Sequence, residues 1–153
     1  MDDYRGMALA IEEARAAAAI GEVPVGAVLA TGDLVVARAG NRRETTGDPT
    51  AHAEMLALRA AATAGGGSQA GGWRLLGSTL YVTLEPCPMC AGAVVAARVG
   101  RLVFGASDPR AGACGSIYNL CADPRLNHQV EVRPDVRGDE CATMLAGWFS
   151  RRR

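Results

Sequence analysis

The sequence predicts an α/β fold in which helices cover both faces of one sheet. Three observations support this prediction. The 153 residues suffice for one hydrophobic core, so residues 1–153 are expected to form a single domain. Short apolar, β-branched runs alternate with runs of helical periodicity. A tight turn joins the first two strands, which makes them antiparallel, whereas helices between the later strands favour parallel pairing.

The N-terminal half contains a helix, a hairpin and a second helix. The amphipathic helix is expected over residues 2–20, where Met7, Ala10, Ile11 and Ala14 recur at spacings of three and four, and Gly21 would end it. Residues 23–30 and 34–39 are apolar runs joined by Thr31-Gly32-Asp33, which predicts a hairpin. A polar loop over residues 41–48 should lead to a helix over residues 51–64, with Thr50 as its N-cap.

The C-terminal half continues the alternation. Residues 64–72 are rich in glycine and serine, and we expect an exposed, flexible connection there. The remaining elements are expected at residues 79–84 (strand), 88–99 (helix), 102–105 (strand), 116–121 (helical turn), 130–133 (strand) and 139–150 (helix).

Composition narrows the functional classes. The formal net charge is zero, so the chain lacks the overall positive field of many nucleic-acid binders, although a local basic patch is compatible with neutrality. No apolar stretch approaches the roughly 20 residues that span a bilayer, and no membrane association is expected. The N-terminus lacks the pattern of a signal peptide. Five cysteines, two of them in a Cys-Pro-Met-Cys cluster, fit a reducing cytoplasm better than a disulfide framework.

Two short clusters carry the residue types of a metal enzyme. One is His52-Ala53-Glu54, and the other runs from Glu85 to Cys90; each lies at the expected start of a helix. Cys87 and Cys90 are three residues apart, so their sulfur atoms should point the same way, and the positive end of the helix favours thiolates. One histidine and two cysteines leave a fourth position on a tetrahedral zinc ion open to water, as in catalytic sites.

The pattern His52-x-Glu54 followed by Pro86-Cys87-x-x-Cys90 resembles the signature of the cytidine and deoxycytidylate deaminase superfamily. Within it, the chain resembles bacterial tRNA-specific adenosine deaminases over nearly its whole length. The matching stretches are residues 22–28, 48–54, 81–87, 89–93, 103–106, 127–128 and 139–141. The glycine-rich residues 65–72 depart from the family by appearing somewhat longer.

The resemblance implies a three-layer αβα cytidine-deaminase-like fold with a central five-stranded mixed sheet. It also implies hydrolytic deamination of adenosine to inosine at the wobble position, 34, of a tRNA anticodon. His52, Cys87 and Cys90 would hold one Zn²⁺ per subunit, and Glu54 would move protons between the zinc-activated water and the base. The expected partners are the anticodon stem-loop of a tRNA and a second copy of the chain in a homodimer.

The same resemblance assigns substrate contacts to Asn41, Pro86 and Asp108. Asn41 would reach the flipped nucleoside, the backbone around Pro86 would contact the reacting centre, and Asp108 would lie in the anticodon groove. Ordinary turns also explain Asn41 and Asp108. Phe149 with the arginines of residues 151–153 fits either an RNA contact or a solvated tail.

Two other functions remain open from the residues alone. The first is a deaminase for a free base or nucleoside, such as guanine or cytosine, built on the same zinc centre. The second is a non-catalytic, zinc-stabilised RNA-binding module, against which Glu54 argues because a structural zinc site needs no extra carboxylate.

Glu85 is interpreted either as a hydrogen-bond partner beside the site or as a strand end. Structural roles are expected for His128, Cys114, Cys121 and Cys141.

Overall fold

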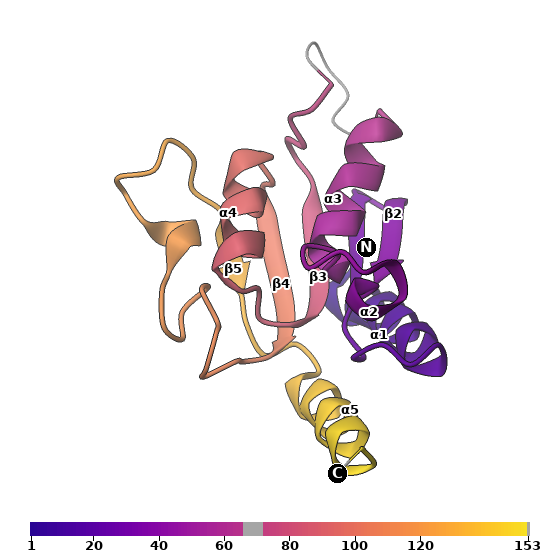
Figure 1. The fold of residues 1–153 in the computed structure, drawn as a ribbon. Helices are drawn as coiled ribbons and strands as arrows, with labels where there is room; N and C mark the ends of the chain where they lie inside the picture. The colour runs from indigo at the N-terminus through magenta and orange to yellow at the C-terminus, as the bar shows by residue number, and fades with distance from the viewer. Residues whose placement is uncertain (66–71, 153) are drawn as a thin grey trace.

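A computed structural model describes residues 1–65 and 72–152 as one mixed sheet with helices on both faces (Figure 1). The flexible connection predicted at residues 64–72 lies largely outside the described residues. The strands are β1 (Gly26–Thr31), β2 (Leu34–Gly40), β3 (Thr79–Leu84), β4 (Arg101–Ala106) and β5 (Glu131–Arg133). The helices are α1 (Asp3–Ala19), α2 (Arg43–Thr46), α3 (Ala53–Thr63), α4 (Pro88–Ala96), α5 (Gly138–Ser150) and the 3₁₀ turn η1 (Leu120–Ala122).

The five strands follow the order β2-β1-β3-β4-β5, so the expected five-stranded mixed sheet is confirmed. β1 pairs antiparallel with β2 and with β3, whereas β3, β4 and β5 are parallel. Parallel pairing brings the carboxyl ends of β3 and β4 to the same edge, where the N–H of Glu85 donates to the carbonyl of Ala106 at 2.8 Å. This edge carries the candidate site.

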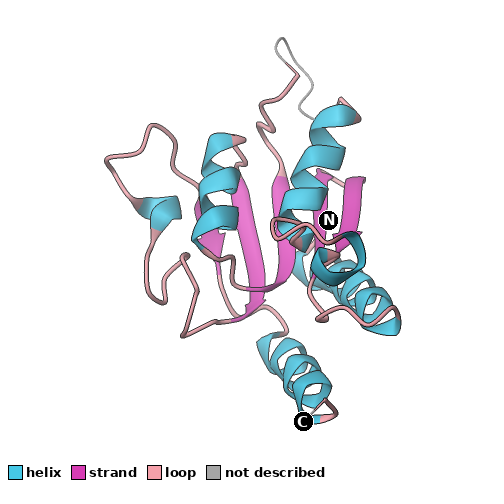
Figure 2. Cartoon of the chain, viewed as in Figure 1, coloured by secondary structure: helices cyan, strands magenta, loops and turns pink. Residues whose placement is uncertain are grey.

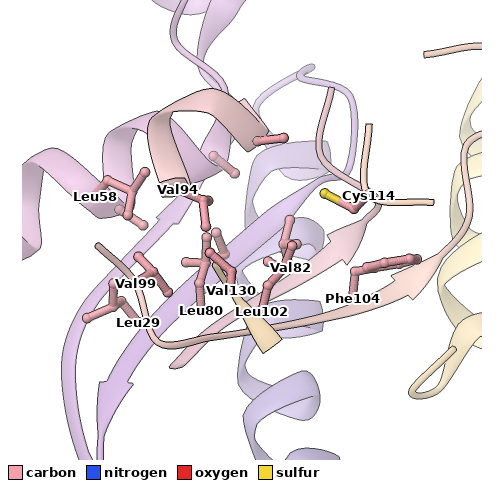
Figure 3. Close-up of a cluster of buried hydrophobic side chains, with 14 of the residues drawn as sticks. Leu29, Leu58, Leu80, Val82, Val94, Val99, Leu102, Phe104, Cys114 and Val130 are labelled. Carbon is pink, nitrogen blue, oxygen red and sulfur yellow. The ribbon is translucent and has the colours of Figure 1, made fainter. Parts of the chain in front are cut away.

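Alternating side chains divide the core between the two faces of the sheet. In β1, Leu29 faces α3 and α4, whereas Val28 faces α1. In β3, Leu80 and Tyr81 divide in the same way. Figure 2 shows the helices on both sides of the strands, and Figure 3 shows the larger cluster beneath α3 and α4. The predicted three-layer αβα arrangement is therefore confirmed.

Helix α3 starts later than predicted, and Thr50 is not its N-cap. The N-cap is His52, while the hydroxyl of Thr50 donates to the carboxylate of Asp48 at 2.7 Å. The Asp48 side chain also accepts from the N–H of Thr50, and this local turn keeps the threonine outside the helix. The predicted polar loop over residues 41–48 likewise contains the short helix α2.

Smaller differences affect the C-terminal half. The helical turn predicted at residues 116–121 is a 3₁₀ turn at Leu120–Ala122, and the last strand begins at Glu131. Gly21 ends α1 as predicted, with a positive φ of 86° that follows the C-cap Ile20. Within residues 1–65 and 72–152, no helix combines the length and apolarity that crossing a bilayer would require.

Candidate metal and catalytic site

The two sequence clusters meet because α3 and α4 begin at the same edge of the sheet (Figure 1). His52 and Cys87 are the N-caps of these helices and have extended backbones. Pro88 occupies the first helical position of α4, where its missing N–H costs no hydrogen bond. Cys90 therefore lies in the first turn of α4, as predicted, and Glu54 lies in the first turn of α3.

The three candidate ligands have the spacing of a tetrahedral site. The Nδ1 atom of His52 lies 3.7 Å from the Sγ atom of Cys87 and 3.4 Å from that of Cys90. Zinc–nitrogen and zinc–sulfur bonds of about 2.0 and 2.3 Å at a tetrahedral angle separate the donor atoms by about 3.5 Å. All three ligand atoms lie within 4.8 Å of one another. The donor set and its spacing therefore fit zinc.

The ionisation of these groups suits a cation. A hydrogen bond with Cys90, supported by His52, lowers the pKa of the Cys87 thiol to about 4. The same contact with Cys87, together with burial, raises the pKa of Cys90, so the two thiols share one proton. The hydrogen bond with Cys87 raises the pKa of His52. A divalent cation would replace these protons, because zinc binds thiolates and a neutral imidazole.

Glu54 is buried beside the three candidate ligands, with an exposed fraction of 4%. Burial raises the pKa of its carboxyl group. A carboxyl group with a raised pKa can accept a proton and return it at neutral pH. Its position in the first turn of α3 also places it near the positive end of the helix.

A cavity of about 250 Å³ opens over this cluster. It is lined by Val23, Val25, Asn41, Arg43, His52, Ala53, Glu54, Leu84, Glu85, Cys87, Asp108, Ala111 and Phe149. Five of the seven residues selected from the sequence are in this set. Cys90 is fully buried beneath the cavity. Pro86 is not among these lining residues; its carbonyl accepts from the N–H of Ala113 at 2.8 Å.

Asn41 and Asp108 lie on loops that flank the cavity, and both also serve those loops. The Oδ1 atom of Asn41 accepts from the N–H of Arg43 at 3.3 Å. The Oδ1 atom of Asp108 accepts from the N–H groups of Arg110 and Ala111 at 3.0 and 3.2 Å. The turn interpretation and the cavity interpretation are therefore compatible at both positions.

Several lining residues were not selected from the sequence. The sequence pattern does not single out Arg43, and it offers Phe149 only together with residues 151–153, as an RNA contact or a solvated tail. Phe149 reaches the cavity from α5, and no local pattern indicates where a terminal helix packs. The apolar wall formed by Val23, Val25 and Leu84 gave no signal distinct from that of core strands.

The residues expected to be structural lie in structural surroundings. The Nε2 atom of His128 hydrogen-bonds to the carbonyl oxygen of Val99 at 2.7 Å. Cys114, Cys121 and Cys141 are buried in the core clusters.

The family model of the cytidine and deoxycytidylate deaminase zinc-binding region matches residues 1–106, which include both clusters. The chain belongs to this deaminase family. Among the relatives of this family member is the tRNA-specific adenosine deaminase of Bacillus subtilis, which is 53% identical over 92% of this chain and 84% of the relative. The corresponding protein of Haemophilus influenzae is 46% identical over 99% of this chain and 85% of the relative.

Solved structures of the family have the same fold. A structure from a study of A-to-I editing by tRNA:A34 deaminases at the wobble position has a TM-score of 0.84 and 44% identity, over 92% of this chain and 99% of the other. A guanine deaminase from Nitrosomonas europaea has a TM-score of 0.80 and 26% identity, over 97% of this chain and 85% of the other. The predicted resemblance to bacterial tRNA-specific adenosine deaminases is thus confirmed.

Proposed function

We propose that this deaminase hydrolyses adenosine to inosine at the wobble position, 34, of a tRNA anticodon. The observation that carries the proposal is the convergence of His52, Cys87, Cys90 and buried Glu54 on one cavity. This constellation suits hydrolytic deamination of a base that has been flipped out of its stack. The relatives named for the tRNA reaction support RNA as the substrate, because they match this chain along nearly its whole length.

His52, Cys87 and Cys90 would hold one zinc ion per subunit. When bound, zinc would supply a Lewis acid that activates water at neutral pH. The fit of the donor atoms to tetrahedral spacing supports this assignment.

Glu54 would act as the general acid and base. Its buried carboxylate would accept a proton from the attacking water and deliver it to N1 of adenine. It would then transfer the proton of the newly added hydroxyl group to the departing amine. Asn41, Pro86 and Asp108 would contact the nucleoside. The flanking loops support the assignments of Asn41 and Asp108, and the backbone of Pro86 directly precedes Cys87.

An inosine assay tests the proposal. Purified, zinc-loaded protein would be given an anticodon stem-loop with adenosine at the wobble position, and separately free adenosine, cytidine and guanine. Inosine formed only in the stem-loop is the expected result. Turnover of a free base alone would contradict the proposal. It would indicate a deaminase of free bases, like the guanine deaminase from Nitrosomonas europaea.

We further propose that residues 1–153 act as a single domain, in a cytoplasmic homodimer. A groove between α3 and α4 supports the dimer, since most of its lining side chains are apolar. Its lining residues are Met55, Leu58, Arg59, Ala62, Trp73, Ala93, Ala96 and Ala97. The proposed tRNA substrate and the thiols that would act as metal ligands support a cytoplasmic location.

A further inference from the structure

Two buried carboxylates beside the cavity have no part in the proposed proton transfers. Glu22 precedes β1 and Glu85 follows β3, and their exposed fractions are 0% and 2%. We infer that both are positioning residues. They hold the two loops at the rim of the cavity, residues 41–46 and 107–117, at the separation that an RNA nucleoside requires. This inference rests on the proposed function, because it assigns the rim to that substrate.

Glu22 holds the loop that carries Asn41 and Arg43. Its carboxylate accepts a hydrogen bond from the backbone N–H of Glu44 at 3.1 Å. It also accepts from both the backbone N–H and the hydroxyl of Thr45. These donors lie in α2, a single turn that is too short to be stable alone. The position of this side of the rim therefore depends on Glu22.

Glu85 holds the opposite loop, which carries Asp108. Its carboxylate accepts from the backbone N–H groups of Asp108, Cys114 and Ser116 at 2.9, 3.0 and 3.0 Å, and from the Ser116 hydroxyl at 2.5 Å. The loop wraps so tightly that a Cβ atom on Gly112 would lie 2.3 Å from the Cδ atom of Glu85. Only glycine fits there, so the carboxylate and the loop form one packed unit.

The partners of these carboxylates distinguish positioning from general stabilisation. Asp3 is also buried, but its carboxylate pairs with the guanidinium groups of Arg101 and Arg133 at the far end of the sheet strands. Neither Glu22 nor Glu85 has an ion pair among the described residues, and their partners are mostly backbone N–H groups of the rim. Each oxygen of both carboxylates accepts at least one hydrogen bond from these loops, as expected of side chains that hold a backbone in place.

The test uses the variants Glu22→Gln and Glu85→Gln in the full-length, zinc-loaded protein. Glutamine keeps the shape of the side chain but turns an amide donor toward N–H groups that need an acceptor. The loss of one buried acceptor should raise KM for the anticodon stem-loop by about tenfold, while kcat changes by less than about threefold. Zinc content should remain that of the wild-type protein. Amide hydrogen exchange should rise at residues 43–46 in Glu22→Gln and at residues 107–117 in Glu85→Gln.

The control is Asp3→Asn, which disturbs a buried carboxylate away from the rim and should leave KM and rim exchange unchanged. Wild-type KM together with protected rim amides in both glutamine variants would overturn the inference, as would a loss of kcat that parallels a loss of zinc. If the wild-type protein turns over only a free base, the proposed function fails and the RNA assignment of the rim fails with it. Amide hydrogen exchange that rises at residues 43–46 in Glu22→Gln and at residues 107–117 in Glu85→Gln would still establish that the two carboxylates hold the rim.

Discussion

The Nδ1 atom of His52 lies 3.4 Å from the Sγ atom of Cys90, although the two residues are 38 positions apart in the chain. They meet because α3 and α4 pack beside each other on one face of the sheet, with their N-termini at the same edge. The candidate metal site therefore joins two helices whose relative position also depends on the core beneath them. Metal binding and folding should be coupled through this pair.

Removing the metal should lower the melting temperature. At a free zinc concentration of about 1,000 times the Kd, binding to the folded protein adds about 4 kcal/mol to the free energy of unfolding. This corresponds to a shift in melting temperature on the order of 10 °C. Chelation and Cys87→Ala should each produce such a shift, measured by calorimetry with the zinc content of the same samples. Cys141→Ala is the matched control, because Cys141 is a buried cysteine on the other face of the sheet. The Cys141→Ala protein should therefore keep its zinc. Equal zinc content in both variants would contradict the ligand assignment.

Local chemistry made much of this site predictable from sequence. The three-residue spacing of Cys87 and Cys90 fixes their common direction in one helical turn, and His52-x-Glu54 supplies the remaining donor and the carboxylate. The hairpin and the parallel strands were also predictable, since turn residues and periodicity determine them. The contact of Phe149 with the cavity was not, because it depends on how α5 packs. The prediction of Thr50 as the N-cap of α3 is wrong, because the Thr50 side chain hydrogen-bonds to Asp48 in a local turn instead of capping the helix.

Glu54→Gln should separate proton transfer from metal binding. Glutamine preserves the size of the buried side chain but cannot exchange the proton, so turnover should fall by about 10²–10⁴-fold. Zinc content should stay unchanged, because Glu54 is not among the three clustered ligands. Inosine formation and elemental analysis on the same preparation measure both effects. Glu131→Gln, at an exposed position in β5, is the control. A Glu54→Gln protein with full activity would refute the proposed role.

Asp3 should make the free energy of unfolding depend on pH in acid. The hydrogen bond from Arg101, with further contributions from Arg133, lowers the pKa of Asp3 from 3.8 to about 2. Because the folded pKa is the lower one, the stabilisation is complete above the unfolded pKa and is lost as the pH falls through the folded value. The shift corresponds to about 2 kcal/mol. Denaturant titrations should show the advantage of wild type over Asp3→Asn shrinking between about pH 5 and pH 2. A constant difference over this range would contradict the assignment.

The groove between α3 and α4 should be the surface at which two copies meet. Light scattering after size exclusion should give the mass of a dimer for the wild-type protein, and a monomer alone would contradict the proposed assembly. Ala96→Glu places a charge at an exposed position of this groove, so the variant should shift toward monomer, because an unpaired charge is costly to bury in an interface. Ala16→Glu makes the same change at an exposed position of α1, on the opposite layer, and should remain dimeric. If Ala16→Glu dissociates and Ala96→Glu does not, the interface involves α1 instead.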